Sequence, residues 1–346
     1  MRKALNGANV SPMSLLLLGF IASVFLLAAP GLLIYGLFRR SADARAFKGS
    51  TVANILIGTG AVGMVGEAFA LWELAHTNFS KGRLLRIRGR ARTAKTKEGK
   101  GWSRSELLLL EEDVSDLSAQ ERAVVAAAWL RAGELEHASV AAFSQLSLLL
   151  LEVGAPSDLV KRAHRAALDE VSHAEMCFDV AAVLGKVRRA PDVLPQASRG
   201  ESRPREQSLA RLVRGSLLDG ALGEGVAARV ALRTSEHTDH EKLRPILSEI
   251  AREEAIHAEL AWDTIEWCLR EGGAFAENAL RRACDELAEH QTPRFPAFQN
   301  VRVQTLARYG IAPDAAIEEA SNEVLEEVRM RAMALYARST IEHAAA

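Results

Sequence analysis

Two sets of acidic and imidazole side chains recur in this chain with similar spacing. The first set is Glu136 followed by Glu170-x-x-His173, and the second is Glu224 followed by Glu254-x-x-His257. The leading Glu precedes its Glu-x-x-His by 34 residues in the first set (136 to 170) and by 30 in the second (224 to 254). Each interval fits one helix, a short turn and part of an antiparallel helix. Four such helices could aim six ligands at one point, which is enough to hold two metal ions.

The flanks of the two motifs repeat as well. Asp169 precedes the first motif and Glu253 the second, and Ala-Glu follows both, so each copy reads acid-Glu-x-x-His-Ala-Glu. The chain has two other Glu-x-x-His matches, ending at His76 and His137, and neither has these flanks. An internal repeat of this kind indicates a duplicated helix pair.

The six side chains lie on largely apolar helix faces. Glu136, for example, shares its face with Val140, Phe143 and Leu150. Burying unpaired carboxylates costs several kcal/mol of hydration, and four converging carboxylates also repel one another. Two divalent cations would cancel four Glu charges, and a carboxylate–imidazole set suits iron or manganese. The alternative interpretation is a set of charges on the solvated faces of Ala- and Glu-rich helices.

These motifs resemble the ferritin-like diiron-carboxylate superfamily over about residues 120–272. The resemblance implies that Glu136 and Glu224 are the single-Glu ligands and that the two Glu-x-x-His motifs supply the other four. It implies two iron ions, or an iron–manganese pair. Asp169 matches the acid that orients a ligand His in some relatives, and Glu253 takes the equivalent place in the second copy. His137, beside Glu136, is either an extra ligand, a side chain that contacts a ligand from outside, or a surface residue.

The predicted fold is all-α: a ferritin-like four-helix bundle with one long crossover. Short turns are expected at 154–158 and near 235–241. The stretch 186–208 contains three Pro and six Lys or Arg, which indicates the crossover rather than a helix. Gly220, Gly223 and Gly225 surround Glu224. They either make room at the site, as open space or as a π-bulge, or allow close helix packing.

The N-terminal residues have a different character. Leu15–Phe38 is a run of 24 residues without a charge, long enough to cross a bilayer, and Arg39-Arg40 follow it. The apolar run 51–66 is interpreted as a second span, or else as a helix on the membrane surface. Eight Lys or Arg in Lys81–Lys97 place the remaining chain in the cytoplasm by the positive-inside rule and favour contact with anionic lipid.

Four regions follow from these patterns. They are a membrane anchor of one or two transmembrane helices at 1–80, a basic juxtamembrane linker at 81–115, the diiron bundle at 116–272 and a C-terminal helical extension at 273–346. A last helix is expected over Pro313–Ser339, either covering the bundle or mediating self-association as a homo-oligomer. The net charge of −1 does not indicate nucleic acid, and three widely spaced Cys indicate a reducing compartment.

The predicted function is O2- or peroxide-dependent oxidation by a diiron protein at the cell membrane, with its bundle on the cytoplasmic side. No Cys-x-x-Cys of a rubredoxin-type site is present, and the three Tyr lie outside the bundle. The substrate is an unidentified small molecule, and no motif indicates the electron donor. One alternative is a ferroxidase or iron-handling protein whose substrate is Fe(II). Another is a membrane-anchored helical scaffold without catalysis.

Overall fold

The computed structural model describes residues 82–87, 90–102, 104, 108–194, 204–289 and 301–345, and this part of the chain is mostly helical. The apolar runs that predict membrane spans lie outside the described residues. None of the helices within those ranges combines the length and the apolar character that crossing a membrane requires.

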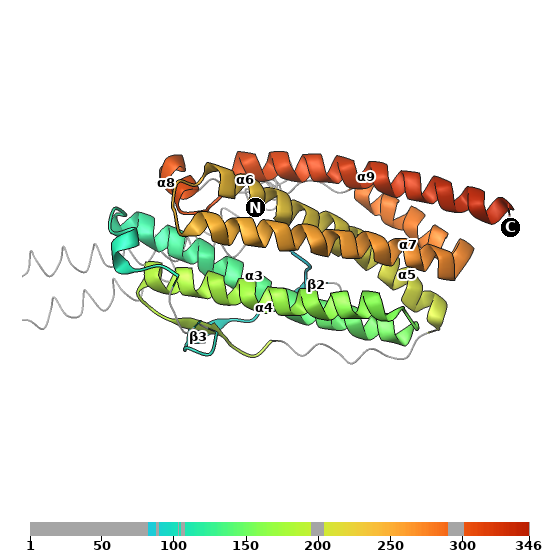
Figure 1. The fold of residues 1–346 in the computed structure, drawn as a ribbon, viewed down its shortest axis with the longest axis horizontal. Coiled ribbons are helices and arrows are strands. Elements are labelled where there is room, and N and C mark those ends of the chain that lie inside the picture. The colour runs from blue at the N-terminus through green and yellow to red at the C-terminus, as the bar shows by residue number, and fades with distance from the viewer. Residues whose placement is uncertain are drawn as a thin grey trace, which may run out of the picture. The chain divides into compact units, whose positions relative to one another are not determined.

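Helices α3 (Ala119–Glu152) and α4 (Ser157–Gly185) form the first antiparallel pair (Figure 1). Helix α3 begins with a capping box, in which Ser118 Oγ accepts from the backbone N–H of Glu121 while the Glu121 carboxylate accepts from the Ser118 N–H. The predicted turn between the helices is confirmed, and Gly154 at φ 75° supplies its left-handed residue. The 34 residues of α3 and 29 of α4 make this pair long enough to carry a site well inside the bundle.

The third rod is built from three consecutive elements. They are α5 (Arg205–Gly215), the π-helix η2 (Ser216–Leu222) and α6 (Gly223–His237). Gly215, Ser216, Leu222 and Gly223 at the junctions all keep right-handed helical dihedrals, so the rod is continuous. The fourth helix, α7 (Leu243–Glu289), packs against all three parts of this rod and also contacts α4.

The connection from α4 to α5 runs from one end of the first pair to the other. At the end of α4, Arg122 Nε donates to the Leu184 carbonyl at 2.7 Å, close to the start of α3. At the start of α5, Arg205 Nε donates to the Val153 carbonyl at 3.1 Å, just beyond the end of α3. The chain therefore crosses the length of the pair between these helices, as the sequence predicts. Residues 195–203 of this connection lie outside the described ranges.

Short strands accompany the helices. Strand β4 (Arg189–Pro191), in the crossover, pairs antiparallel with β3 (Thr96–Glu98), and β1 (Arg86–Ile87) pairs with β2 (Arg90–Ala91). The sequence indicates no strand in these regions. Strands of two or three residues are too short to show an alternation of apolar and polar residues. Their pairing depends on the helices, which bring the segments together.

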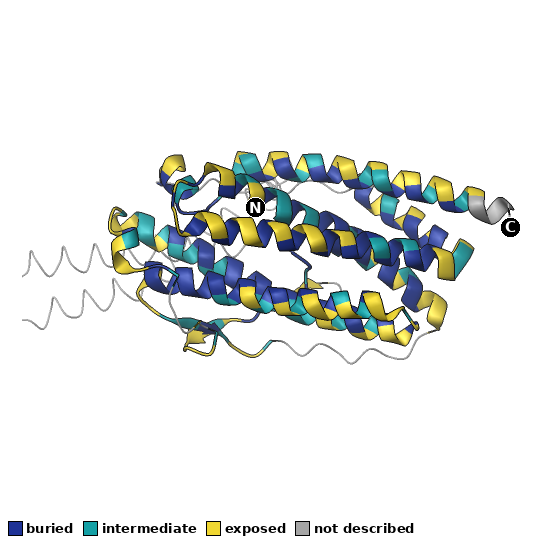
Figure 2. Cartoon of the chain, in the orientation of Figure 1, coloured by how far each residue is buried: buried dark blue, intermediate teal, exposed yellow. Residues whose placement is uncertain are grey.

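Two apolar clusters fill the inside of the helices. One contains Trp129, Val180, Leu247 and their neighbours, and the other contains Leu150, Leu217, Ile265 and theirs. On α3 the first cluster reaches Ala132 and the second begins at Phe143. Figure 2 shows the buried residues along the faces that the helices turn towards one another. The layer between the clusters is where the polar site lies.

The C-terminal extension continues the same unit. Helix α7 bends at Gly273 (φ 48°, ψ −138°), the residue at which the extension was expected to begin. Helix α8 (Val303–Arg308) follows the undescribed stretch 290–300, and α9 (Asp314–Ala345) packs along α6 and α7 (Figure 1). The last helix thus covers the bundle, which is one of the two roles expected for it.

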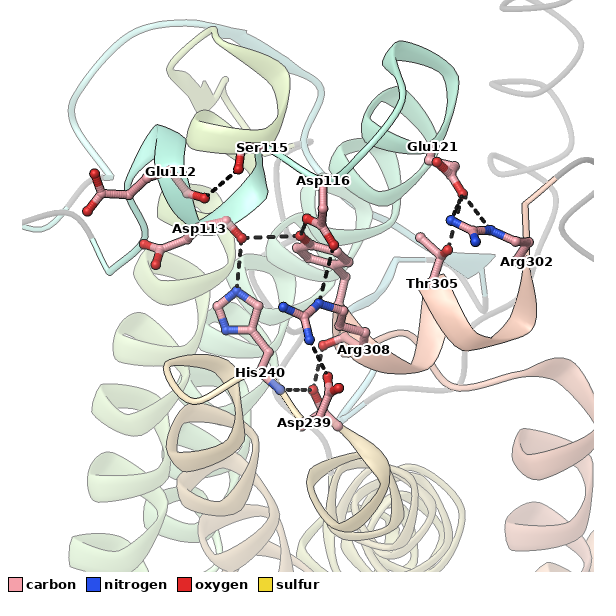
Figure 3. Close-up of polar contacts among 12 residues, drawn as sticks. Glu112, Asp113, Ser115, Asp116, Glu121, Asp239, His240, Arg302, Thr305 and Arg308 are labelled. Carbon is pink, nitrogen blue, oxygen red and sulfur yellow. Dashed lines mark hydrogen bonds and ion pairs between the residues drawn. The ribbon is translucent and has the colours of Figure 1, made fainter.

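A polar network fixes α8 to the end of the bundle (Figure 3). Arg308 forms ion pairs with Asp239, at 2.8 Å, and with Asp116, at 3.4 Å. The Tyr309 hydroxyl donates to the Asp116 carboxylate, and its oxygen lies 3.1 Å from the Asp113 carbonyl oxygen. These contacts join the turn before α7, the 3-10 helix η1 (Glu111–Val114) and the residues after α8.

Candidate metal centre

The structure brings the six predicted ligands together in one buried cluster. Each is at most 3% exposed, although every one is an acid or an imidazole. Their donor atoms form two groups of four, and within each group the atoms lie within 4.8 Å of one another. The first group is Glu136, Glu170, His173 and Glu254, and the second is Glu170, Glu224, Glu254 and His257. Because Glu170 and Glu254 belong to both groups, the arrangement offers two adjacent sites joined by two carboxylates.

Each helix contributes to the cluster according to its periodicity. Helix α3 supplies Glu136 and α6 supplies Glu224, while α4 and α7 each supply a Glu and a His three residues apart on one face. The apolar clusters lie on both sides of this polar layer, so water has little access to it. The site is therefore held by four rigid helices in surroundings of low polarity.

The two histidines present the same nitrogen to the cluster. His173 Nδ1 lies 3.5 Å from Glu254 Oε1 and 3.7 Å from Glu170 Oε2. His257 Nδ1 lies 3.4 Å from Glu170 Oε1 and 3.6 Å from Glu254 Oε2. Both imidazoles thus direct Nδ1 at the two shared carboxylates.

The opposite nitrogen of each ring contacts an outer acid from the other motif. His173 Nε2 donates to Glu253 at 2.9 Å, and His257 Nε2 donates to Asp169 at 3.4 Å. An ionised carboxylate only accepts hydrogen bonds, so Nε2 carries the proton and Nδ1 of a neutral ring is left with its lone pair free. Asp169 therefore accepts a hydrogen bond from a histidine of the cluster, as expected. Glu253 does the same, at the shorter of the two distances.

Salt bridges on the protein surface balance the outer acids. Arg165 pairs with Asp169 at 2.9 Å, and Arg252 pairs with Glu253 at 2.7 Å. The His173 hydrogen bond is the main cause that lowers the pKa of Glu253. Burial alone would raise the pKa of Asp169, but its contacts with His257 and Arg165 lower it. Both outer acids are held as anions, which is the state that orients the imidazoles.

The inner groups titrate abnormally because they are buried together. Burial raises the pKa of Glu136 and of Glu224 well above the usual range, and the neighbouring carboxylates raise it further. Burial favours neutral His173 and His257, but their carboxylate neighbours dominate and raise both pKa values well above normal. Burial also opposes ionisation of Glu254, yet contacts with the two histidines lower its pKa. Without a metal, this cluster retains protons that a metal would displace.

The donor set fits a pair of divalent cations. Eight buried atoms of these six side chains have no hydrogen-bond partner, and they are one or both carboxylate oxygens of each Glu and Nδ1 of each His. Leaving a buried polar atom unbonded costs about 1–3 kcal/mol, so eight together call for a ligand. Four carboxylates and two imidazoles are suitable donors for iron or manganese.

His137 is not brought into either donor group. Its ring is half-buried and packs edge-on against Trp102, with 4.6 Å between ring centres. Glu134, of the unmatched Glu-x-x-His, pairs with Arg131 at 2.8 Å instead of joining the cluster. Of the candidates for outer contacts, the structure thus places Asp169 and Glu253, but not His137, against the ligands.

A π-helix leads directly into the candidate ligand Glu224. Gly220 and Gly223 lie here at close approaches: a Cβ at Gly220 would lie 2.5 Å from the Ala261 Cβ, and one at Gly223 would lie 3.0 Å from the Gly82 carbonyl oxygen. The sequence suggested either a π-bulge or close helix packing at these glycines. The structure has both, because the π-helix and the close packing occur in the same turns.

Two residues beside the centre carry no signal in the sequence. Gly82, at φ 71°, lies so close that a Cβ there would be 3.3 Å from Glu224 Oε2 and 3.8 Å from Glu136 Oε2. Arg83 is only 7% exposed, and its carbonyl accepts from Ser139 Oγ at 2.9 Å. In the sequence Arg83 is one of eight basic residues in a run, and no local pattern separates it from those at the surface.

A cavity of about 40 Å³ reaches the centre from the side of the extension. Glu136 and Glu254 are among its lining residues, and Gly310, Ile311 and Ala312 after α8 form part of its wall. Most of its other lining is apolar, from Ala128, Trp129, Ala132, Leu135, Cys177, Ala227, Val230, Ala231, Thr234, Leu247 and Ile250. Trp129 Nε1 donates to the Tyr309 carbonyl at 2.9 Å, which ties this wall to α3.

Comparison of the chain with protein-family models, with curated proteins and with solved structures found no match.

Proposed function

We propose that this chain is a membrane-tethered diiron protein of the ferritin-like type that carries out O2- or peroxide-dependent oxidation. The observation that carries the proposal is the cluster of Glu136, Glu224 and two Glu-x-x-His motifs, with their donor atoms in two groups that share two carboxylates. Four helical rods and one long crossover between the second and third are the arrangement in which ferritin-like proteins hold such a set.

The ligands of this chain would each have a distinct task. Glu170 and Glu254 would bridge the two sites, Glu136 and His173 would complete one, and Glu224 and His257 would complete the other. Asp169 and Glu253 would keep Nδ1 of both rings directed inwards. Two ferrous ions in such a set supply one electron each for the activation of oxygen.

The cavity supports an uncharged small molecule as the species that reaches the centre by this route. A volume of about 40 Å³ holds only a few atoms, and the mostly apolar lining suits O2 better than a hydrated cation. This observation favours oxidation of a separate substrate over the iron-handling alternative, in which Fe(II) would pass repeatedly to the same ligands. The oxidation would draw on an external electron donor.

The experiment that tests the proposal is anaerobic Fe(II) loading of the full-length protein, followed by O2 and observed by optical absorption. We expect about two irons per chain and a new absorption band after O2 is added. Glu136→Gln should lose metal, while Glu134→Gln is the matched control, because Glu134 lies on the same helix in a part-buried ion pair with Arg131 and outside both donor groups. Equal metal content in both variants would refute the dimetal site and favour the scaffold alternative.

A second measurement separates substrate oxidation from iron handling. Fe(II) and O2 are added in many equivalents, and the retained iron is counted after gel filtration. Retention that stops at about two irons per chain supports the oxidase, whereas continued uptake supports iron handling.

The membrane tether rests on the apolar runs before residue 81, and it is tested separately. The full-length chain should stay with membranes in alkaline carbonate and enter solution only in detergent.

A further inference from the structure

A buried arginine without an acidic partner lies beside the proposed metal centre. Arg83 is 7% exposed, and among the described residues no carboxylate oxygen lies within 4.0 Å of its guanidinium. Its Nε has no hydrogen-bond partner. A buried guanidinium without a partner costs several kcal/mol of hydration, so its position calls for an explanation.

The surrounding structure is shaped to hold this side chain. The guanidinium carbon lies 5.3 Å from the centre of the Phe143 ring, and that ring in turn packs on His257 with 5.0 Å between ring centres. On another side, Arg83 Nη2 packs against the π-helix at Gly220, where a Cβ would lie 2.8 Å from it. The backbone is fixed by the hydrogen bond from Ser139.

The acids near Arg83 are already committed elsewhere. Asp219 pairs with Arg86 at 2.9 Å. Glu224 and Glu170 are among the charges that act on Arg83, but both belong to the donor groups. In the metal-free protein, these acids therefore act on the charge of Arg83 only from a distance and form no ion pair with it.

Metal loading changes this balance. Two divalent ions bring four positive charges, which cancel the four Glu of the cluster when the histidines are neutral. The charge of Arg83 then has no compensation, and the loaded centre carries one excess positive charge in surroundings of low polarity. Such a site attracts one monoanion.

We propose that Arg83 and the metal-loaded centre together form a binding site for one carboxylate-type anion. This inference rests on the proposed function, because it requires the metal pair. The planar guanidinium has parallel N–H donors that match the two oxygens of a carboxylate, which is the geometry that arginine recognises best. The anion is either a small free carboxylate or the carboxylate group of the substrate, which would then be an organic acid.

The test uses the full-length protein loaded with Co(II), which reports on its ligands without redox turnover. Formate and butyrate are titrated into the protein and followed by calorimetry and by the visible spectrum of the metal. We expect one anion to bind the loaded protein and none to bind the metal-free protein. Tighter binding of butyrate than of formate would identify an organic acid, and binding of formate alone a small free anion; both support the site.

Variants assign the binding to Arg83. Arg83→Met should retain both metals and weaken anion binding by about tenfold or more, because a charge-assisted hydrogen bond is lost. Arg83→Lys, which keeps the charge and should fold even if the Met variant does not, should weaken binding less. Arg92→Met is the matched control, since Arg92 is exposed in the same basic segment.

The two proposals fail in different ways. Two bound metals with equal formate affinity in the wild type, Arg83→Lys and Arg83→Met would overturn the anion site and leave the dimetal centre standing. Absence of metal binding in the wild type would overturn both.

Discussion

His173 donates a hydrogen bond of 2.9 Å from Nε2 to Glu253, the residue that immediately precedes the candidate ligand Glu254 on the opposite helix. His257 makes the reciprocal contact with Asp169. The two motifs therefore orient each other's imidazoles. In each acid–Glu pair, the first acid accepts a hydrogen bond from a histidine of the other motif, and the Glu belongs to the donor groups. This exchange explains why the acid before each motif is repeated along with the motif itself.

Glu253→Gln should weaken metal binding although Glu253 is not in either donor group. The amide can still accept from His173 Nε2, but it loses the negative charge that makes the ring a better donor. Loss of such an outer partner lowers metal affinity by about 10- to 100-fold. Competition with a coloured chelator measures this change. Glu249→Gln, an exposed position one turn earlier on α7, is the control, and equal affinities in the two variants would contradict the orienting role.

Metal should stabilise the wild type more than Glu136→Gln. Binding to the folded state adds about 2.7 kcal/mol when free metal is at 100 times its dissociation constant, and the variant loses one donor of its first group. In the metal-free state, the same substitution removes one of four converging carboxylates, so we expect no loss of thermal stability. Calorimetry with and without a chelator measures both. An equal metal-induced rise in Tm for the two proteins would be inconsistent with Glu136 as a ligand.

Ala128→Leu should slow the reaction with O2 without removing metal. Ala128 is 7% exposed and lines the cavity that ends at Glu136 and Glu254, so a larger side chain would fill that space. Overpacking of this kind costs about 1–3 kcal/mol of stability, which the protein must tolerate for the test to apply.

Stopped-flow mixing of the Fe(II) protein with O2 measures this effect. We expect a rate about tenfold lower, equivalent to roughly 1.4 kcal/mol of barrier. Ala123→Leu, at an exposed position on the same helix, should react like the wild type. Unchanged rates in the cavity variant would show that O2 reaches the centre by another path.

The start of α3 should be sensitive to acid through Glu121. Hydrogen bonds from Ser118, and then from Thr305 and Arg302, lower the pKa of this carboxyl from 4.5 to about 2 (Figure 3). Because the folded-state pKa is the lower one, the stabilisation is present above pH 4.5 and is lost as the pH falls from 4.5 towards about 2.

Thermal unfolding of the wild type and Glu121→Gln at several pH values measures this contribution. The wild type should have the higher Tm at pH 7, and the difference should shrink as the pH falls below 4.5. Glu112→Gln, an exposed acid on η1, provides the control. A difference in Tm that stays constant down to pH 3 would mean that Glu121→Gln destabilises the protein for a reason other than the lost charge.

The six candidate donors could be predicted from the sequence alone, because residues three or four apart along a helix share one face. Glu170 and His173 must lie on one side of any helix that contains them, and the apolar residues around Glu136 identify which side is buried. The repeat of the flanking acids indicated Asp169 and Glu253 as well. The turns after α3 and α6 and the Pro-rich crossover could also be predicted, because the residues that end a helix lie within the segment itself.

Only the tertiary structure decided what lies against these donors. Arg83 is one basic residue among several, and in the fold its guanidinium packs against Phe143 and Gly220, both distant in the sequence. His137 adjoins a ligand in the sequence, yet a helix turns neighbouring residues about 100° apart, and its ring packs on Trp102. Contacts between segments far apart in the chain leave no periodic pattern in either one, so they exist only once the helices have packed.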